Sequence, residues 1–190
     1  MIAFILNLII VFLEFIVFIG LKRKNDVFKY YTYFQNYIAL ITSLLFCVFF
    51  FTFKECLCLL KGVRYVVTCS LILASFVYIV ILSKNNKFTK DDFNIINPNL
   101  ANIILHYICP ILSLISLVYF ETNICIIGNV WTMIACVPSI LYLVIYIILT
   151  TIFKEEPYKV SKNNNLFNII SLIFIPFIFI LISYVLWNII

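Results

Sequence analysis

Long apolar runs without a charged residue alternate with short polar segments along the whole chain. The runs cover residues 30–53, 65–83, 93–120, 122–153 and 163–190, and a sixth, at residues 1–21, is interrupted only by Glu14. Each is near or above the roughly 20 residues that a helix needs to cross a hydrocarbon core about 30 Å thick. Because membrane strands alternate lipid-facing and lumen-facing positions, continuously apolar runs favour helices over a barrel.

This pattern predicts an all-α fold, a polytopic membrane protein whose single domain, residues 1–190, is a bundle of six transmembrane helices. The predicted spans are 2–21, 30–53, 64–83, 99–120, 130–153 and 166–189. The first run has no basic segment before it and no small-residue cleavage motif, so we expect it to be a retained helix and not a signal peptide. The connections are too short to form a second domain, so any chemistry must lie in or against the helices.

The composition agrees with a lipid environment. Hydrophobic residues make up 65% of the chain and charged residues 11%, against roughly 45–50% and about 25% in soluble domains. Exposed apolar area on that scale would aggregate in water, which excludes a soluble globular protein. The 20 Phe, 12 Tyr and 3 Gly exclude a disordered, collagen-like or coiled-coil chain as well.

Basic residues are distributed unevenly among the connections. The first, third and fifth connections contain ten Lys or Arg, whereas the second with its flank contains three, Lys54, Lys61 and Arg64, and the fourth none. The positive-inside rule then places the odd connections in the cytoplasm and both termini outside a cell membrane. The basic residues are scattered, which does not indicate nucleic-acid binding, and anionic lipid headgroups are a sufficient partner for them.

Seven cysteines give an odd number, and buried free thiols are the simplest interpretation. The Cys56-Leu57-Cys58 pattern and a single histidine provide no zinc-binding set, so we predict no metal and no cofactor. Cys56 or Cys58 and Cys125 fall on connections predicted to lie outside, where a disulfide is chemically feasible.

Three prolines fall inside the predicted fourth, fifth and sixth helices, namely Pro110, Pro138 and Pro176. Each removes a backbone hydrogen bond and opens a kink, and three kinks favour a cavity in the bundle. The alternative is that these prolines are simply tolerated, as prolines often are in membrane helices.

Several polar residues fall at a similar depth in different predicted helices. Glu14 lies seven residues from the cytoplasmic end of the first helix, about 10 Å at ~1.5 Å per residue, and His106 lies seven residues into the fourth. Thr32 and Asn36 are four residues apart, as are Asn102 and His106, so each pair shares a helix face. We therefore expect one polar layer near the inner leaflet, with Glu14 facing the bundle interior.

This layer has the groups needed for nucleophilic acyl transfer. It combines a hydroxyl, an imidazole that can accept its proton, amides that can donate to an oxyanion and a carboxylate that can orient the imidazole. Polar residues of this kind also join membrane helices through hydrogen bonds. A purely structural polar cluster is therefore the alternative interpretation of the same residues.

The motifs in these helices resemble those of the androgen-induced and androgen-dependent membrane threonine hydrolases, and more closely those of the bacterial six-helix relatives of that family. The resemblance is carried by Lys-Tyr-Tyr-Thr-Tyr-Phe-Gln-Asn at 29–36, by Leu-Ala-Asn-Ile-Ile-Leu-His-Tyr-Ile-Cys-Pro at 100–110, and by Trp131, Pro138, Tyr142 and Tyr146. It implies a threonine nucleophile at Thr32 and a histidine base at His106, acting on a lipid ester such as a fatty-acid ester of a hydroxy fatty acid. The chain departs from the bacterial pattern after the fifth helix, where Glu-Glu-Pro-Tyr-Lys-Val at 155–160 replaces a Tyr-Pro-Tyr-Pro-Phe-like segment.

Two other functions fit the sequence. Cys109 lies three residues after His106 on roughly the same helix face, which would suit an acyltransferase with a thiol nucleophile. A non-catalytic membrane protein, either a small transporter or an assembly subunit, would use the polar layer for packing or for a solute. Against transport, the chain has only 3 Gly and no visible pair of broken helices or internal repeat.

Overall fold

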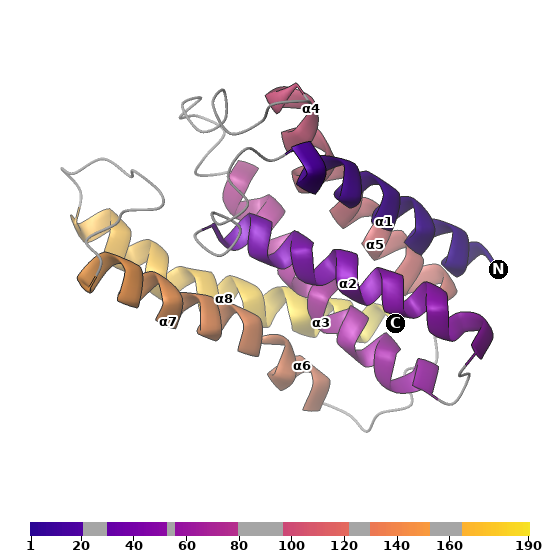
Figure 1. The fold of residues 1–190 in the computed structure, drawn as a ribbon. Helices are drawn as coiled ribbons and strands as arrows, with labels where there is room; N and C mark the ends of the chain where they lie inside the picture. The colour runs from indigo at the N-terminus through magenta and orange to yellow at the C-terminus, as the bar shows by residue number, and fades with distance from the viewer. Residues whose placement is uncertain (21–29, 53–55, 80–96, 122–129, 153–164) are drawn as a thin grey trace.

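The computed structural model describes residues 1–20, 30–52, 56–79, 97–121, 130–152 and 165–190. Every regular element in these ranges is a helix (Figure 1). The predicted all-α class is therefore confirmed for the described part of the chain.

Four helical stretches are long and apolar enough to cross a membrane. They are α1 (Ile2–Gly20), α2 (Tyr31–Thr52), α3 (Leu57–Val77), and a fourth stretch that joins α4 (Pro98–Ile103), η4 (Ile104–Ile108), α5 (Cys109–Ile115) and η5 (Ser116–Phe120). The first, second and fourth agree with the predicted spans to within about a residue at each end. The remaining helices are α6 (Val130–Ala135), α7 (Val137–Thr151) and α8 (Asn165–Ile189).

The predicted start of the third helix is wrong, because α3 begins at Leu57 and not at residue 64. The prediction treated Lys61 and Arg64 as charges of a connection. In the structure Arg64 is fully buried and paired with a carboxylate, and a charge that is neutralised inside a bundle does not end a helix. At its other end α3 stops at Val77, and a wider helical turn continues to Ile79.

The prolines act differently in the three helices that contain them. Before Pro110 the helix widens into the π-helical segment η4, where the Cys109 backbone N–H donates to the carbonyl oxygen of Ile104, five residues earlier. The predicted fifth helix is two helices, because the chain breaks at Cys136 and Pro138 occupies the first turn of α7. A proline is favoured there because its missing N–H would have no helical partner. In contrast, α8 is continuous through Pro176.

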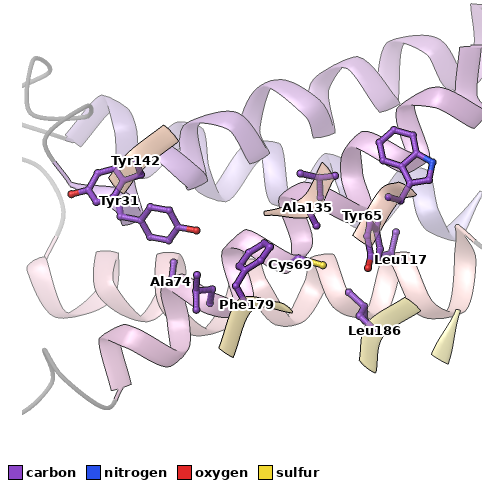
Figure 2. Packing of buried hydrophobic residues seen from close by; sticks show 12 residues of the cluster. Tyr31, Tyr65, Cys69, Ala74, Leu117, Ala135, Tyr142, Phe179 and Leu186 are labelled. Atoms are coloured by element: carbon purple, nitrogen blue, oxygen red, sulfur yellow. The ribbon is translucent and has the colours of Figure 1, made fainter. Parts of the chain in front are cut away.

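The central helix is α3, which buries the largest share of its residues among the four long helices. It packs against α2, α5, α6 and α8, and Figure 1 shows α8 and α7 on the opposite side of it from α1 and α5. The largest apolar cluster fills this region (Figure 2). Tyr31 packs against Tyr142 with ring centroids 4.9 Å apart, and the Tyr65 hydroxyl donates to the backbone oxygen of Ser183 at 2.5 Å, joining α3 to α8.

The bundle has an apolar surface, and its interior contains many polar side chains among the apolar ones. Large apolar side chains point outward from most helices, including Phe12 (62% exposed), Phe51 (61%) and Tyr119 (71%). The buried polar residues of α1 to η5 and the residue that follows are Asn7, Glu14, Thr32, Gln35, Asn36, Thr42, Ser43, Arg64, Thr68, Ser70, Asn102, His106, Ser113, Ser116 and Glu121. A surface this rich in large apolar side chains is unlike that of a water-soluble protein, so the packing as well as the hydropathy indicates a membrane protein.

A close approach between α3 and α6 depends on Gly62. A Cβ atom built at Gly62 would lie 2.5 and 2.6 Å from two ring carbons of Trp131, far inside van der Waals contact. The indole ring of Trp131 is buried, so it cannot simply move into open space.

We predict that Gly62→Ala destabilises the protein by about 1–3 kcal/mol, the usual effect of an extra methyl group in a filled core. Thermal unfolding of the purified protein in detergent measures it. Trp131→Phe provides the methyl group with space, so Gly62→Ala should cost much less in a Trp131→Phe background. Equal losses in the two backgrounds would contradict this contact.

Candidate functional site

All five residues of the predicted polar layer are buried in the bundle. Glu14 on α1 and Asn36 on α2 have no exposed surface, His106 on η4 is 5% exposed, and Thr32 on α2 and Asn102 on α4 are each 8% exposed. Burial of this extent among membrane helices means that each polar group meets other protein groups or an internal ligand and not lipid.

The helix segments that carry these residues pack against one another through an apolar cluster. Its buried members come from α1, α2 and the stretch from α4 to the start of α5: Val17, Tyr33, Ala101, Ile104, Leu105 and Cys109. These residues lie within three positions of Glu14, Thr32, Asn102 or His106 along the chain. The structure therefore brings together the segments that the sequence placed at one depth. We call this end of the bundle the His106 region.

The His106 imidazole is held against an aromatic ring. It stacks on Tyr78, at the end of the α3 helix, with ring centroids 3.6 Å apart and an interplanar angle of 12°. Its Nδ1 atom is buried and has no hydrogen-bond partner among the described residues. Tyr78 thus fixes the plane of the imidazole, a role that the sequence analysis did not assign to it.

Thr32 and Asn36 share a face of α2, as their spacing predicts. The Asn36 Nδ2 donates to the backbone oxygen of Thr32 at 2.8 Å, while the Asn36 Oδ1 is buried without a partner in the described part of the chain. Within those same residues, no hydrogen bond joins the Thr32 hydroxyl to His106.

Glu14 faces the interior, as expected, but its carboxyl group is isolated. Neither oxygen has a hydrogen-bond partner in the described ranges. The charge of Arg64 on α3 acts on it electrostatically, and a charge on Glu14 would in turn act on the Cys109 thiol.

Gln35 is a buried polar residue that was not predicted from the sequence. Its side chain is fully buried, and both the amide nitrogen and the amide oxygen have no hydrogen-bond partner in the described helices. The signal was available, because Gln35 is three residues from Thr32 and therefore on the same helix face. Gln35 adds both a donor and acceptors to the polar groups of the His106 region.

A second polar cluster surrounds an ion pair that the sequence analysis did not predict. The Arg64 Nε lies 3.0 and 2.9 Å from the two carboxylate oxygens of Glu121. The Arg64 Nη1 donates to Ser43 at 2.8 Å and Nη2 to Ser113 at 3.4 Å. The Arg64 guanidinium also lies 5.7 Å from the centre of the Phe46 ring.

Two further donors complete the shell around Glu121. The Asn7 Nδ2 donates to the Glu121 Oε1 at 3.0 Å, and the Ser116 hydroxyl donates to the same oxygen at 2.5 Å. Thr68 bonds to Ser113 at 2.7 Å and to the backbone oxygen of Arg64 at 2.8 Å. We call these residues the Arg64–Glu121 network, which joins α1, α2, α3, α5 and η5.

The described cysteines are free thiols, at positions 47, 56, 58, 69, 109 and 136. A disulfide from Cys56 or Cys58 to Cys125 was the predicted alternative. Cys125 lies outside the described residues, and so does that pairing. No group of three His, Cys, Asp or Glu side chains in the described ranges could hold a metal ion. Cys109 is fully buried among apolar side chains, where a thiolate would be poorly stabilised.

The chain matches no protein-family model, no curated protein and no solved structure. Chemically, the two polar clusters differ. Most polar atoms of the Arg64–Glu121 network have partners within the protein, whereas Glu14, Gln35, Asn36 and His106 present buried polar atoms without described partners. Buried polar groups usually find partners, so the His106 region is the better candidate for binding water or a polar ligand.

We predict that Arg64→Met destabilises the protein by about 3–5 kcal/mol, because it leaves the Glu121 carboxylate buried without its cation. The double variant Arg64→Met/Glu121→Gln should recover most of that loss, since it removes both charges together. Denaturant or thermal unfolding in detergent measures the stability of the parent, the two single variants Arg64→Met and Glu121→Gln, and the double variant. Lys61→Met, one turn earlier on α3 and partly exposed, is the matched control and should cost far less. Additive losses at Arg64 and Glu121 would contradict the pairing.

Proposed function

We propose that this chain is an integral membrane lipid-ester hydrolase in which Thr32 is the nucleophile and His106 the base. The substrate is an ester that enters from the lipid of the inner leaflet. The observation that carries the proposal is the set of unpartnered buried polar atoms on Glu14, Gln35, Asn36 and His106, which lie on α1, α2 and η4. Thr32 is also on α2.

The proposed reaction has two steps. The Thr32 Oγ1 attacks the ester carbonyl carbon while the imidazole accepts the hydroxyl proton, and the alcohol leaves with that proton from His106. A water molecule, activated by the same imidazole, then hydrolyses the acyl-threonine and restores the enzyme. The His106 Nδ1 has no hydrogen-bond partner among the described residues, and in the neutral tautomer with its hydrogen on Nε2 this nitrogen can accept a proton.

The amides of the region can stabilise the oxyanion that forms in each step. One N–H of the Asn36 amide is committed to the Thr32 backbone oxygen, so its second N–H, the Gln35 amide and Asn102 are the candidate donors. Donors fixed in a water-poor site before the reaction stabilise developing charge strongly. This adds Gln35 to the residues expected to affect turnover.

Structural packing is the competing interpretation, in which the chain is a non-catalytic membrane protein. It is favoured by the lack of a Thr32–His106 hydrogen bond among the described residues, although such bonds are often long before substrate binds. A Cys109 nucleophile fits less well, because that thiol is buried in an apolar cluster.

We predict that Thr32→Val and His106→Ala each reduce ester turnover, and labelling by a hydroxyl-reactive fluorophosphonate probe, by at least two orders of magnitude, since each removes a reacting group. Turnover of a lipid-ester panel by purified protein is the measurement. Thr42→Val is the matched control: its buried hydroxyl, on the same helix, donates to the Ala39 backbone oxygen at 3.1 Å. This bond lies within α2 and involves no reacting group, so the control should keep its activity. Parental turnover by folded Thr32→Val and His106→Ala would refute the assignment of these residues.

We further propose that the bundle crosses the membrane six times, with both termini outside. The two termini lie toward the same end of the bundle in Figure 1, as an even number of crossings requires. The burial of Arg64 in an ion pair removes it from the basic residues of the second connection, which strengthens the charge bias toward the odd connections.

Single cysteines introduced into a background without the seven native cysteines test this orientation. A cysteine at Lys24 or Lys162 should be protected from a membrane-impermeant thiol reagent in intact cells, and one at Asn129 should react. Permeabilised cells are the control, since all three positions should then be labelled. The opposite pattern would invert the orientation without changing the number of helices.

A further inference from the structure

We propose that the membrane-embedded core binds one proton at Glu14, in charge balance with the Arg64–Glu121 ion pair. This inference does not depend on the hydrolase proposal. It concerns three ionisable side chains that have no exposed surface, Glu14, Arg64 and Glu121.

The net charge of this trio depends on how many protons its carboxyl groups hold. One guanidinium and two ionised carboxylates would leave a net negative charge inside an apolar bundle. A buried charge without a partner is strongly unfavourable, and the usual outcome is that the group takes up a proton and becomes neutral. The trio is neutral when it holds exactly one proton on a carboxyl group.

The hydrogen bonds indicate which carboxyl group holds the proton. Glu121 accepts from the Arg64 Nε, from Asn7 and from Ser116, and such donors stabilise the ionised form. Glu14 accepts no hydrogen bond from a described residue. The ionised group is therefore Glu121, and the protonated group is Glu14.

The surroundings of Glu14 on each neighbouring helix agree with this assignment. From α3, Arg64 acts on it at longer range than on Glu121. From α5, the Cys109 thiol is the titratable neighbour, and His106 lies three residues before Cys109. On α2, which packs against α1, the buried polar groups without described partners are the neutral amides of Gln35 and Asn36. The other Lys or Arg of the described helices is Lys61, which is partly exposed one turn before Arg64 on α3; Arg64 is the cation that acts on Glu14.

The position along α1 places Glu14 between the two polar clusters. Asn7, seven residues earlier, bonds to Ser116 and Glu121, and Val17, three residues later, packs with Leu105 in the His106 region. A neutral carboxylic acid donates one hydrogen bond, so Glu14 at this point can supply a proton toward the His106 region. Because it is neutral, it would not act as the carboxylate that orients the His106 imidazole.

The proton at Glu14 is coupled to the ion pair, because Arg64 needs one negative partner. If Glu121 is made neutral, Glu14 becomes the remaining counter-ion, ionises and releases its proton to the solvent. If Arg64 is made neutral, Glu121 loses its cation and becomes protonated as well. The two carboxyl groups then hold two protons. The number of bound protons therefore follows the charge of the pair.

Infrared spectroscopy of the purified full-length protein in lipid nanodiscs tests the proposal at neutral pH. The parent should show the carbonyl stretch of a buried protonated carboxylic acid, and Glu14→Gln should lose it. Because glutamine resembles a protonated glutamate in shape and charge, this variant should fold with a melting temperature close to that of the parent. Thr42→Val, which leaves both carboxyl groups intact, is the control and should keep the band.

Two more variants test the coupling. Glu121→Gln should lose the band although Glu14 is still present, and Arg64→Met should show it at about twofold intensity. The proposal is overturned if the parent lacks the band, if Glu14→Gln retains it or fails to fold, or if folded Glu121→Gln retains it. Ester turnover is not part of this readout, so an inactive protein that shows the expected bands would contradict the hydrolase proposal alone.

Discussion

The arrangement of the described helices depends on the ion pair between Arg64 and Glu121. In a lipid environment a buried charge cannot be hydrated, so each of these side chains requires the opposite charge of the other. The pair, with Asn7 and Ser43, ties together α1, α2, α3 and the end of η5. A shift of one residue in any of these helices would turn its polar side chain toward lipid or apolar neighbours. The network therefore fixes one register of packing for these helices, whereas their apolar outer faces alone would allow many registers.

This constraint explains why the two polar clusters can differ. The Arg64–Glu121 network, in which most polar atoms have partners, holds one geometry and can then support a neighbouring region whose polar groups are not all satisfied. Glu14, Gln35, Asn36 and His106 carry six of the eight buried unpartnered polar atoms of the described residues. A stable bundle tolerates such groups where they serve binding or chemistry. The favourable packing of the rest of the core offsets the unfavourable free energy of burying them.

Much of the fold could be predicted from the sequence because the thickness of a membrane sets the length of an apolar helix. The predicted limits of α1 and α2, and of the stretch ending at Phe120, agree closely with the structure for this reason. The start of α3 could not be found in this way, because a hydropathy pattern treats Arg64 as exposed. It includes no information about the counter-ion Glu121, which lies 57 residues later in the chain. The depths of Thr32 and His106 were predictable from helix geometry. The stacking of Tyr78 on His106 and the isolation of Gln35 were not, because both depend on how the helices rotate against each other.

The direction of His106 depends on a backbone feature that residue spacing alone does not reveal. In an α-helix consecutive side chains are about 100° apart around the helix axis. In η4, Ile104, Leu105 and His106 are all buried, and the wider π turn reduces the angle between them. Pro110 supplies the cause, because it has no N–H for the carbonyl oxygen of His106, four residues earlier, and its ring crowds that oxygen. Widening the helix relieves this conflict. The proline thus acts on the imidazole through the backbone, and it does so next to the Tyr78 ring that fixes the imidazole plane.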